Sequence, residues 1–297
     1  MVLYYLIKDL ITKNMQETIT SSIRPTLTSF AMLLVVDIGN SHTVVGLYMD
    51  DQLQAHWRLK SDHKQTVDEI AIQFHTLFSM AAIPQLKITG IIISSVVPSL
   101  EAAWLECCTK HFSSHLSSSP FIVSDKTMSG LITIDIDYPG EVGADRLVNG
   151  LAAWSQYRRN LIVIDFGTAI TFDCITENCE YIGGTILPGV AISLEALAAK
   201  TAKLPHIDIS TPPASIIGKN TVDAMKSGIL HGYGALIDGL VDTLGQQMST
   251  IAPPQCLATG GMANLVIPYC KKVTHIEQML TLKGLHYIYT TVHGGQS

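Results

Sequence analysis

This sequence has few charged residues and no long apolar run. Each of these absences excludes some classes of protein. Charged residues make up 15% of the chain and hydrophobic ones 47%, which favours a well-buried globular protein. No apolar stretch approaches the roughly 18 residues of a membrane-spanning helix, so we expect no membrane association. The formal net charge is −6 and there is no run of Lys or Arg, which argues against a nucleic-acid surface.

Cysteine pairs are also absent. None of the six cysteines forms a C-x-x-C pair, so we expect no structural zinc site. Scattered cysteines in a chain of 297 residues are typical of the reducing cytoplasm. The length is sufficient for two domains, each with its own core.

A conspicuous feature that is present is an acid at the end of an apolar run. Leu33–Val36 is apolar, Asp37 follows directly, and Thr43–Tyr48 is apolar again, which predicts a β-hairpin. Gly39 and Asn40 suit its tight turn. Backbone amides in such a turn can cradle phosphate, and the carboxylate can hold Mg²⁺ directly or through water. A polar turn without any ligand explains this single stretch equally well.

A second stretch, LIVIDFGTAITFDCI at 161–175, repeats the pattern. A gapless alignment gives these equivalences: Asp37 with Asp165, Gly39 with Gly167, and Thr43 with Thr171. A repeat about half the chain apart predicts duplicated domains with two acid-tipped hairpins facing each other. The pattern resembles the actin, sugar kinase and Hsp70 superfamily. That resemblance implies an α/β fold of two ribonuclease-H-like (actin-like ATPase) domains with an ATP cleft between them.

Apolar periodicity predicts the element order β-β-β-α-β-α-β for the first domain. Its clearest parts are the alternating strand Gln52–Lys60, the capping box from Thr66 to Glu69, the strand Ile88–Val97 and the helix Leu100–Phe112. We expect the first domain at 32–146 and the second at 147–297.

Residues 1–31 differ from the rest of the chain. Their apolar part, Val2–Ile7, is too short for a signal-peptide core. Met32 directly precedes the first strand, so we expect 1–31 to be an N-terminal extension outside the fold, with translation starting at Met32. A genuine N-terminal helix is the alternative.

The second domain contains a glycine-rich helical segment. Asn220–Met248 is predicted to be one long or broken helix, and Gly228, Gly232 and Gly234 suit close packing, within the domain or against a second copy. An Ala191–Ala202 helix precedes it, and His286–Val292 is predicted to be only a last helical turn or two.

A Pro- and Gly-containing loop, Asp135–Arg146, leads into a predicted helix. It places Asp145 at the start of that helix, where its charge suits the dipole, with Arg146 next to it. A carboxylate there can accept a hydroxyl proton, and the guanidinium can orient an anionic substrate. The alternative is a helix-capping Asp beside a solvated Arg.

Four motifs in order resemble the type III pantothenate kinase family: DIGNSHTVVG (37–46), GADR (143–146), DFGTAITFD (165–173) and GGTILPG (183–189). Three further motifs fit the same family: SSVVP (94–98), GKNTVDAMKSG (218–228) and TGG (259–261). The resemblance covers the chain from Met32 to about Tyr289. The glycine pair in TGG resembles the superfamily's adenosine loop. The resemblance implies phosphorylation of pantothenate by ATP, the first step of coenzyme A synthesis.

The resemblance also implies roles for single residues. Asp145 would be the catalytic base, and Asp165 would hold a monovalent cation (K⁺ or NH₄⁺). Mg²⁺ at Asp37, directly or through water, is the expectation drawn above from the hairpin itself. The implied ATP-binding residues are Asp37, Ile38, Gly39, Asn40, Ser41, His42, Thr43, Val44 and Thr168. The implied pantothenate-binding residues are Tyr138, Gly143, Ala144, Asp145, Arg146 and Thr221. Tyr138 is a substitute, because the family's usual tyrosine position holds Ile136 here.

Two other functions remain open from the sequence. One is a kinase of the same superfamily that acts on a sugar or another small acid, and the other is a non-catalytic nucleotide-sensing regulator. The GADR and GKNT motifs favour pantothenate, and the presence of Asp37, Asp145 and Asp165 argues against a regulator. The expected partners are ATP, pantothenate and a second copy of the chain in a homodimer.

Overall fold

The computed structural model describes residues 32–83, 88–112, 116–248, 252–273 and 275–294. Met32–Ser297 forms one compact unit, and the predictions made for 1–31 lie outside the described residues. None of the helices in the described ranges is both long enough and apolar enough to cross a membrane.

The first sheet has five strands in the order β3-β2-β1-β4-β5. Its strands are β1 (Met32–Ile38), β2 (His42–Met49), β3 (Gln52–Lys60), β4 (Ile88–Ser95) and β5 (Phe121–Ile122). The first three are antiparallel neighbours, whereas β4 runs parallel to β1 and β5. With α2 (Val67–Met80) and α3 (Pro98–Phe112), the chain order is the predicted β-β-β-α-β-α-β. The predicted capping box is also present, since Thr66 and Glu69 cap α2 reciprocally.

The second sheet also has five strands, in the order β10-β7-β8-β9-β6. They are β6 (Thr133–Ile134), β7 (Leu161–Phe166), β8 (Ala169–Ile175), β9 (Glu180–Pro188) and β10 (Gln255–Thr259). β7, β8 and β9 form an antiparallel meander and β10 runs parallel to β7, which repeats the arrangement of the first sheet. The strand β6 was not predicted, because two residues are too few to produce a period-two pattern.

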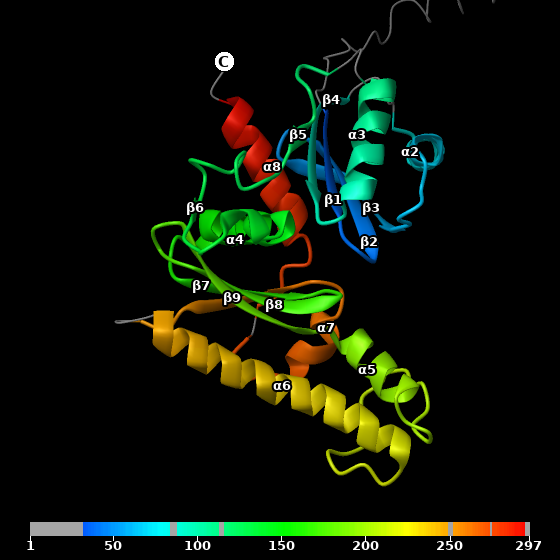
Figure 1. Ribbon diagram of the computed structural model, residues 1–297, viewed down its shortest axis with the longest axis vertical. Helices are drawn as coiled ribbons and strands as arrows, with labels where there is room; N and C mark the ends of the chain where they lie inside the picture. Colours follow the sequence, from blue (N-terminus) through cyan, green and yellow to red (C-terminus); the bar gives the residue numbers. More distant parts are fainter. Residues whose placement is uncertain (1–31, 84–87, 113–115, 249–251, 274, 295–297) are drawn as a thin grey trace, which may run out of the picture. The chain divides into compact units, whose positions relative to one another are not determined.

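Helices cover both faces of the second sheet (Figure 1). One face carries α4 (Ala144–Tyr157), which packs on α8 (Leu280–His293). The other face carries α5 (Val190–Ala199), α6 (Thr221–Met248) and α7 (Ala263–Val266). Short 3-10 turns, η2 (Pro139–Glu141) and η3 (Ile267–Tyr269), precede α4 and follow α7.

Among the described residues, the apolar core has three parts. Residues of β1, β4, β7 and β8 share one buried cluster with α4 and α8. A second cluster lies between the first sheet and α2 with α3, and a third lies between the second sheet and α5, α6 and α7. The layer of α4 and α8 therefore contacts the inner faces of both sheets.

The bounds of two helices differ from those predicted. The last helix is longer than predicted, because α8 begins at Leu280 rather than near His286. Gly284 interrupts the apolar pattern of this helix, so the pattern does not predict its first turns. In the structure a Cβ at this position would lie 2.7 Å from the Val148 carbonyl oxygen, so glycine permits the close contact with α4. The segment predicted over Ala191–Ala202 ends earlier, at Ala199.

The long helix α6 is continuous rather than broken. Gly234 packs directly on the Tyr269 carbonyl group of η3, so this glycine serves contacts within the chain. Gly228 and Gly232 have open space where a side chain would be.

Candidate active site

The turn of the first hairpin is held in place by Ser61, which lies outside the DIGNSHTVVG motif. The Gly39 amide donates to the His42 carbonyl over 3.0 Å and closes the turn. The Ser61 hydroxyl donates to the Gly39 carbonyl over 2.6 Å and lies 3.0 Å from the Thr43 hydroxyl. Thr43 and Ile38 are both buried, so their side chains are shielded from solvent.

The two hairpins are similar but not identical in length. Asp37 lies opposite Val44 across the first hairpin, whereas Asp165 lies opposite Thr171 across the second. The second loop is therefore one residue shorter, and Thr171 occupies the place of Val44 rather than that of Thr43. The gapless equivalence of Thr43 with Thr171 is wrong for this reason.

The tips of the two hairpins touch. The Ser41 hydroxyl lies 2.8 Å from the Thr168 hydroxyl, across 127 positions of sequence. Both residues were predicted to bind ATP, and the fold places them side by side.

Three carboxylates lie behind these tips, on Asp37, Asp145 and Asp165. Burial, together with the charges of Asp145 and Asp165, raises the pKa of Asp37 to about 8. Burial and the charges of Asp145 and Asp173 raise the pKa of Asp165 to about 7. Burial also raises the pKa of Asp145, while the amide of Arg146, which donates to its carboxylate over 2.8 Å, acts against the rise. Mutual repulsion of this kind is typical of sites that bind cations or move protons.

Asp165 is positioned by the preceding helix, α4, and by the last helix, α8. The Asn149 side-chain amide donates to its carboxylate over 3.3 Å, and Thr281 donates to the Asn149 carbonyl oxygen over 2.8 Å. Asn149 lies one turn after Asp145 on α4, so both side chains project on the same side of the helix. Gly260, in the left-handed region with φ +91°, packs directly on the Asp165 carboxylate.

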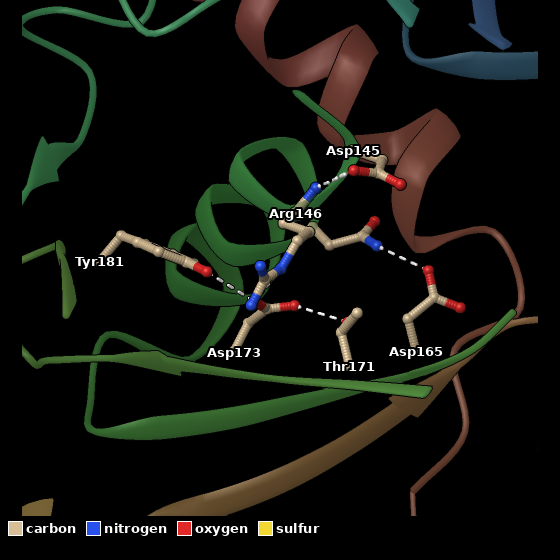
Figure 2. A network of polar contacts seen from close by, with 7 residues as sticks. Asp145, Arg146, Asp165, Thr171, Asp173 and Tyr181 are labelled. Carbon is tan, nitrogen blue, oxygen red and sulfur yellow. Dashed lines mark hydrogen bonds and ion pairs between the residues drawn. The ribbon is translucent and has the colours of Figure 1, made fainter. Parts of the chain in front are cut away.

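Arg146 is held by a buried acid on β8 (Figure 2). Its Nε donates to the Asp173 carboxylate over 2.7 Å, and Asp173 is fully buried. Tyr181 donates to the same oxygen over 2.8 Å, and Thr171 donates to the other oxygen over 2.9 Å. Three donors thus stabilise the ionised Asp173, which fixes the guanidinium. Sequence analysis missed this role of Asp173, although an acid inside an apolar strand signals a buried partner.

The two remaining predicted pantothenate-binding residues are Tyr138 and Thr221. Tyr138, just before η2, is 68% exposed. Thr221 begins α6, on the face of the second sheet opposite to α4 and Asp145 (Figure 1). The fold of one chain therefore brings Gly143, Ala144, Asp145 and Arg146 together but does not bring Thr221 to them.

The acids suit hard cations, which prefer oxygen ligands. Among the described residues, no three acid, histidine or cysteine side chains converge into a ready metal cage. Mg²⁺ needs no such cage, because it usually keeps several waters and binds through one or two carboxylates plus substrate phosphates. Asp37 and Asp165 can supply these carboxylates, and a bound cation would relieve their repulsion.

Comparison with known proteins identifies the family. Residues 33–243 match the family model described as type III pantothenate kinase. A type III pantothenate kinase from Desulfotalea psychrophila is 52% identical over 258 residues, which cover 86% of this chain and 97% of that protein. The chain belongs to the type III pantothenate kinase family. A second pantothenate kinase of this type, from Citrifermentans bemidjiense, is 45% identical over 259 residues, covering 87% of this chain and 98% of the relative.

Solved structures with low sequence identity share the fold. A reductive activator for a corrinoid, iron-sulfur protein superposes with a TM-score of 0.54 at 10% identity, over 91% of this chain and 62% of the other. A ROK family transcriptional regulator superposes with a TM-score of 0.51 at 10% identity, over 90% and 79% of the two chains. With the two matching sheets, these similarities confirm the actin-like α/β fold expected of a pantothenate kinase.

Proposed function

We propose that this chain transfers the γ-phosphoryl group of ATP to the primary hydroxyl of pantothenate, at the site between the two hairpins. The observation that carries the proposal is electrostatic: the charges of Asp145 and Asp165 act on Asp37, and that of Asp145 acts on Asp165, beside an arginine fixed by a buried acid. Membership of the pantothenate kinase family supplies the substrate class.

Phosphoryl transfer depends mainly on placing the reactants and neutralising charge. The backbone amides of the first hairpin, from Asp37 to Val44, would bind the phosphate chain, with Thr168 contacting it from the second hairpin. Asp145 would accept the proton of the acceptor hydroxyl. Its raised pKa suits this task, because a base works best when its pKa approaches the working pH.

Arg146 would bind the pantothenate carboxylate. Its Nε is engaged by Asp173, and within the described chain no hydrogen bond occupies its two terminal nitrogens. Those nitrogens can form a charge-assisted pair with a carboxylate. Gly143 and Ala144 would contact the substrate through their backbone, and Tyr138 would contact it from the exposed loop.

Asp37 would hold Mg²⁺, directly or through water, and Asp165 would hold K⁺ or NH₄⁺. These cations would neutralise the negative charge of ATP and of the transferred group. Activity should therefore be much lower in buffer that contains only Na⁺ and should recover on adding K⁺ or NH₄⁺. Equal rates in all three salts would remove the assignment to Asp165.

The deciding assay uses the purified full-length chain with ATP and Mg²⁺ and detects phosphorylated product and ADP. Pantothenate should be phosphorylated, whereas hexoses and unrelated small acids should not. A chain that binds ATP but phosphorylates none of these compounds would instead be a nucleotide-sensing regulator.

We also propose a cytoplasmic homodimer. All six cysteines are free, as in reducing compartments. Gly228 and Gly232 lie one turn apart on α6 and are exposed, and Leu236, one turn further on, is 40% exposed. Because the two glycines carry no side chain, this side of α6 offers a flat surface for a second copy. Gly232→Arg should convert the dimer into a monomer in light-scattering measurements, and a wild-type monomer would contradict the proposal.

A homodimer would also explain the position of Thr221. Because Thr221 and Asp145 lie on opposite faces of one sheet, Thr221 would contact pantothenate bound to a second copy. Mixing inactive Asp145→Asn and Thr221→Arg subunits should then restore activity that neither variant has alone. Failure of the mixed dimer to recover activity would place Thr221 outside the pantothenate pocket.

A further inference from the structure

Arg58 lies outside every motif discussed so far, yet it contacts the first hairpin. It lies on β3 opposite Val44, the residue that in turn lies opposite Asp37. Its Nη2 lies 3.2 Å from Nδ1 of His42, at the start of β2. A guanidinium can only donate, so Nδ1 of His42 accepts this bond and the ring is neutral. Burial and the charge of Arg58 both lower the pKa of His42, in agreement with a neutral ring.

The same guanidinium also reaches the second sheet. A Cβ at Gly261 would lie 3.0 Å from Nη1 and 3.1 Å from Nη2 of Arg58, so the planar group lies directly against the Gly261 backbone. Gly260 and Gly261 follow β10, and Gly260 packs on the Asp165 carboxylate. Arg58 therefore contacts both the first hairpin and the Gly260–Gly261 loop that packs on Asp165.

This cation has no acidic partner in the described part of the chain. No carboxylate of the described residues lies within ion-pair distance of Arg58, and its side chain is exposed. His42 is its one side-chain hydrogen-bond partner there. Its charge nevertheless acts on Asp165, whose pKa it lowers. A fork of N–H groups held at a glycine loop, without a counter-charge, is suited to a polyanion.

We propose that Arg58 binds the phosphate chain of the nucleotide, with His42 and the Gly261 backbone holding its guanidinium in place. The ligand class is a nucleoside di- or triphosphate, bound between the first hairpin and the Gly260–Gly261 loop. The inference rests on the proposed ATP site, and it adds a positively charged side chain to a site otherwise made of backbone amides, hydroxyls and acids.

The test measures binding of ATP, ADP and adenosine by calorimetry, and steady-state kinetics, for wild type and Arg58→Gln. Losing charge-assisted hydrogen bonds should raise the Kd for ATP and ADP by roughly 10- to 100-fold. The Kd for adenosine and the KM for pantothenate should change by less than about twofold, because neither ligand carries the phosphate chain. Arg159→Gln, an exposed arginine between α4 and β7, is the matched control and should match wild type throughout.

A second variant covers the case in which Arg58→Gln does not fold. Arg58→Lys keeps the charge but loses the planar fork, so its Kd for ATP should lie between those of wild type and Arg58→Gln. Unchanged ATP and ADP affinity in either folded variant would overturn the inference. An equal loss of affinity for adenosine would also overturn the inference. Arg58 would then only hold the first hairpin against the Gly260–Gly261 loop and would not bind the phosphates. A wild-type chain that binds ATP but leaves pantothenate unphosphorylated would instead refute the proposed function.

Discussion

Asp145 and Arg146 are neighbours in sequence, but helix α4 directs them to different partners. The Asp145 carboxylate accepts from the helix's own first amides and lies near the two hairpin acids, whereas Arg146 crosses to Asp173. The motif therefore combines a candidate base and a candidate anion-binding group on one helical turn.

Replacing Asp145 by Asn should separate catalysis from binding. The amide keeps the shape of the side chain but cannot accept the hydroxyl proton, so kcat should fall by roughly 10²–10⁴ while the Kd for ATP stays close to wild type. A thermal melt must show that the variant is folded, since the charge at the helix start contributes up to about 1 kcal/mol. Asp242→Asn, which breaks a surface ion pair with Lys272, is the control and should leave kcat unchanged. Near-normal kcat in folded Asp145→Asn would mean that the residue only caps α4.

Asp173 should matter to pantothenate through Arg146. Asp173→Asn leaves the half-buried Arg146 guanidinium without its buried counter-charge, so we expect the unfolding free energy to fall by about 3–5 kcal/mol and the KM for pantothenate to rise. Tyr181→Phe removes one hydrogen bond to Asp173 and should cost about 1.5–3 kcal/mol with a smaller rise in that KM. A neutral amide analogue of pantothenate separates the two effects, because it gives Arg146 no carboxylate to bind. If its KM rises as much as that of pantothenate, Asp173 is merely structural.

Asp37 should make stability depend on pH. Its folded pKa, about 8, lies above the ordinary value of 3.8, so the folded state holds a proton that the unfolded state has released. The resulting stabilisation is complete below about pH 4 and is lost as the pH rises toward 8. Without Mg²⁺ and ATP, the melting temperature should therefore decrease between pH 5 and pH 8, and less steeply in Asp37→Asn. Parallel slopes for the two proteins would show that Asp37 is already ionised throughout this range.

Individual elements were predictable where the signal is local. The strands around Asp37 and Asp165 and the Thr66 cap follow from patterns within a few residues. The side chains that hold the acids in place were not predictable. Ser61 and Asn149 lie 22 and 16 positions from the residues that they hold, and Thr281 lies 132 positions from Asn149, so no local pattern marks them.

The contact between α4 and α8 depends on one glycine. Gly284→Val would push a branched side chain into the Val148 carbonyl and the Ala152 side chain, and overpacking of this kind typically costs about 1–3 kcal/mol. Gly239→Val adds the same side chain on the exposed side of α6, where nothing lies within 4 Å of the added Cβ, and should change the unfolding free energy little. Denaturant titration of both variants provides the measurement. Equal midpoints would mean that the two helices can move apart at no cost.

The repeated hairpins made the plan of the whole molecule predictable. Each sheet opens with an acid-tipped antiparallel pair and receives a parallel strand beside it. The domain boundary between 146 and 147 remains a prediction. It would fall inside α4, which runs from Ala144 to Tyr157.

We expect residues 1–31 to be dispensable. The compact unit Met32–Ser297 holds both hairpins and the acids. A chain starting at Met32 should therefore keep the melting temperature and kcat of the full chain. An insoluble or inactive truncation would show that the extension belongs to the fold.

The position of α8 has a consequence for synthesis of the chain. This helix, near the end of the sequence, packs against β1, β2 and β4 of the first sheet, and Gly90 leaves room there for Tyr289. A ribosome releases the N-terminal sheet long before it makes Leu280–His293. Until then the part of that sheet's apolar face that α8 covers stays exposed, so the nascent chain cannot complete this core and remains open to chaperones or to aggregation.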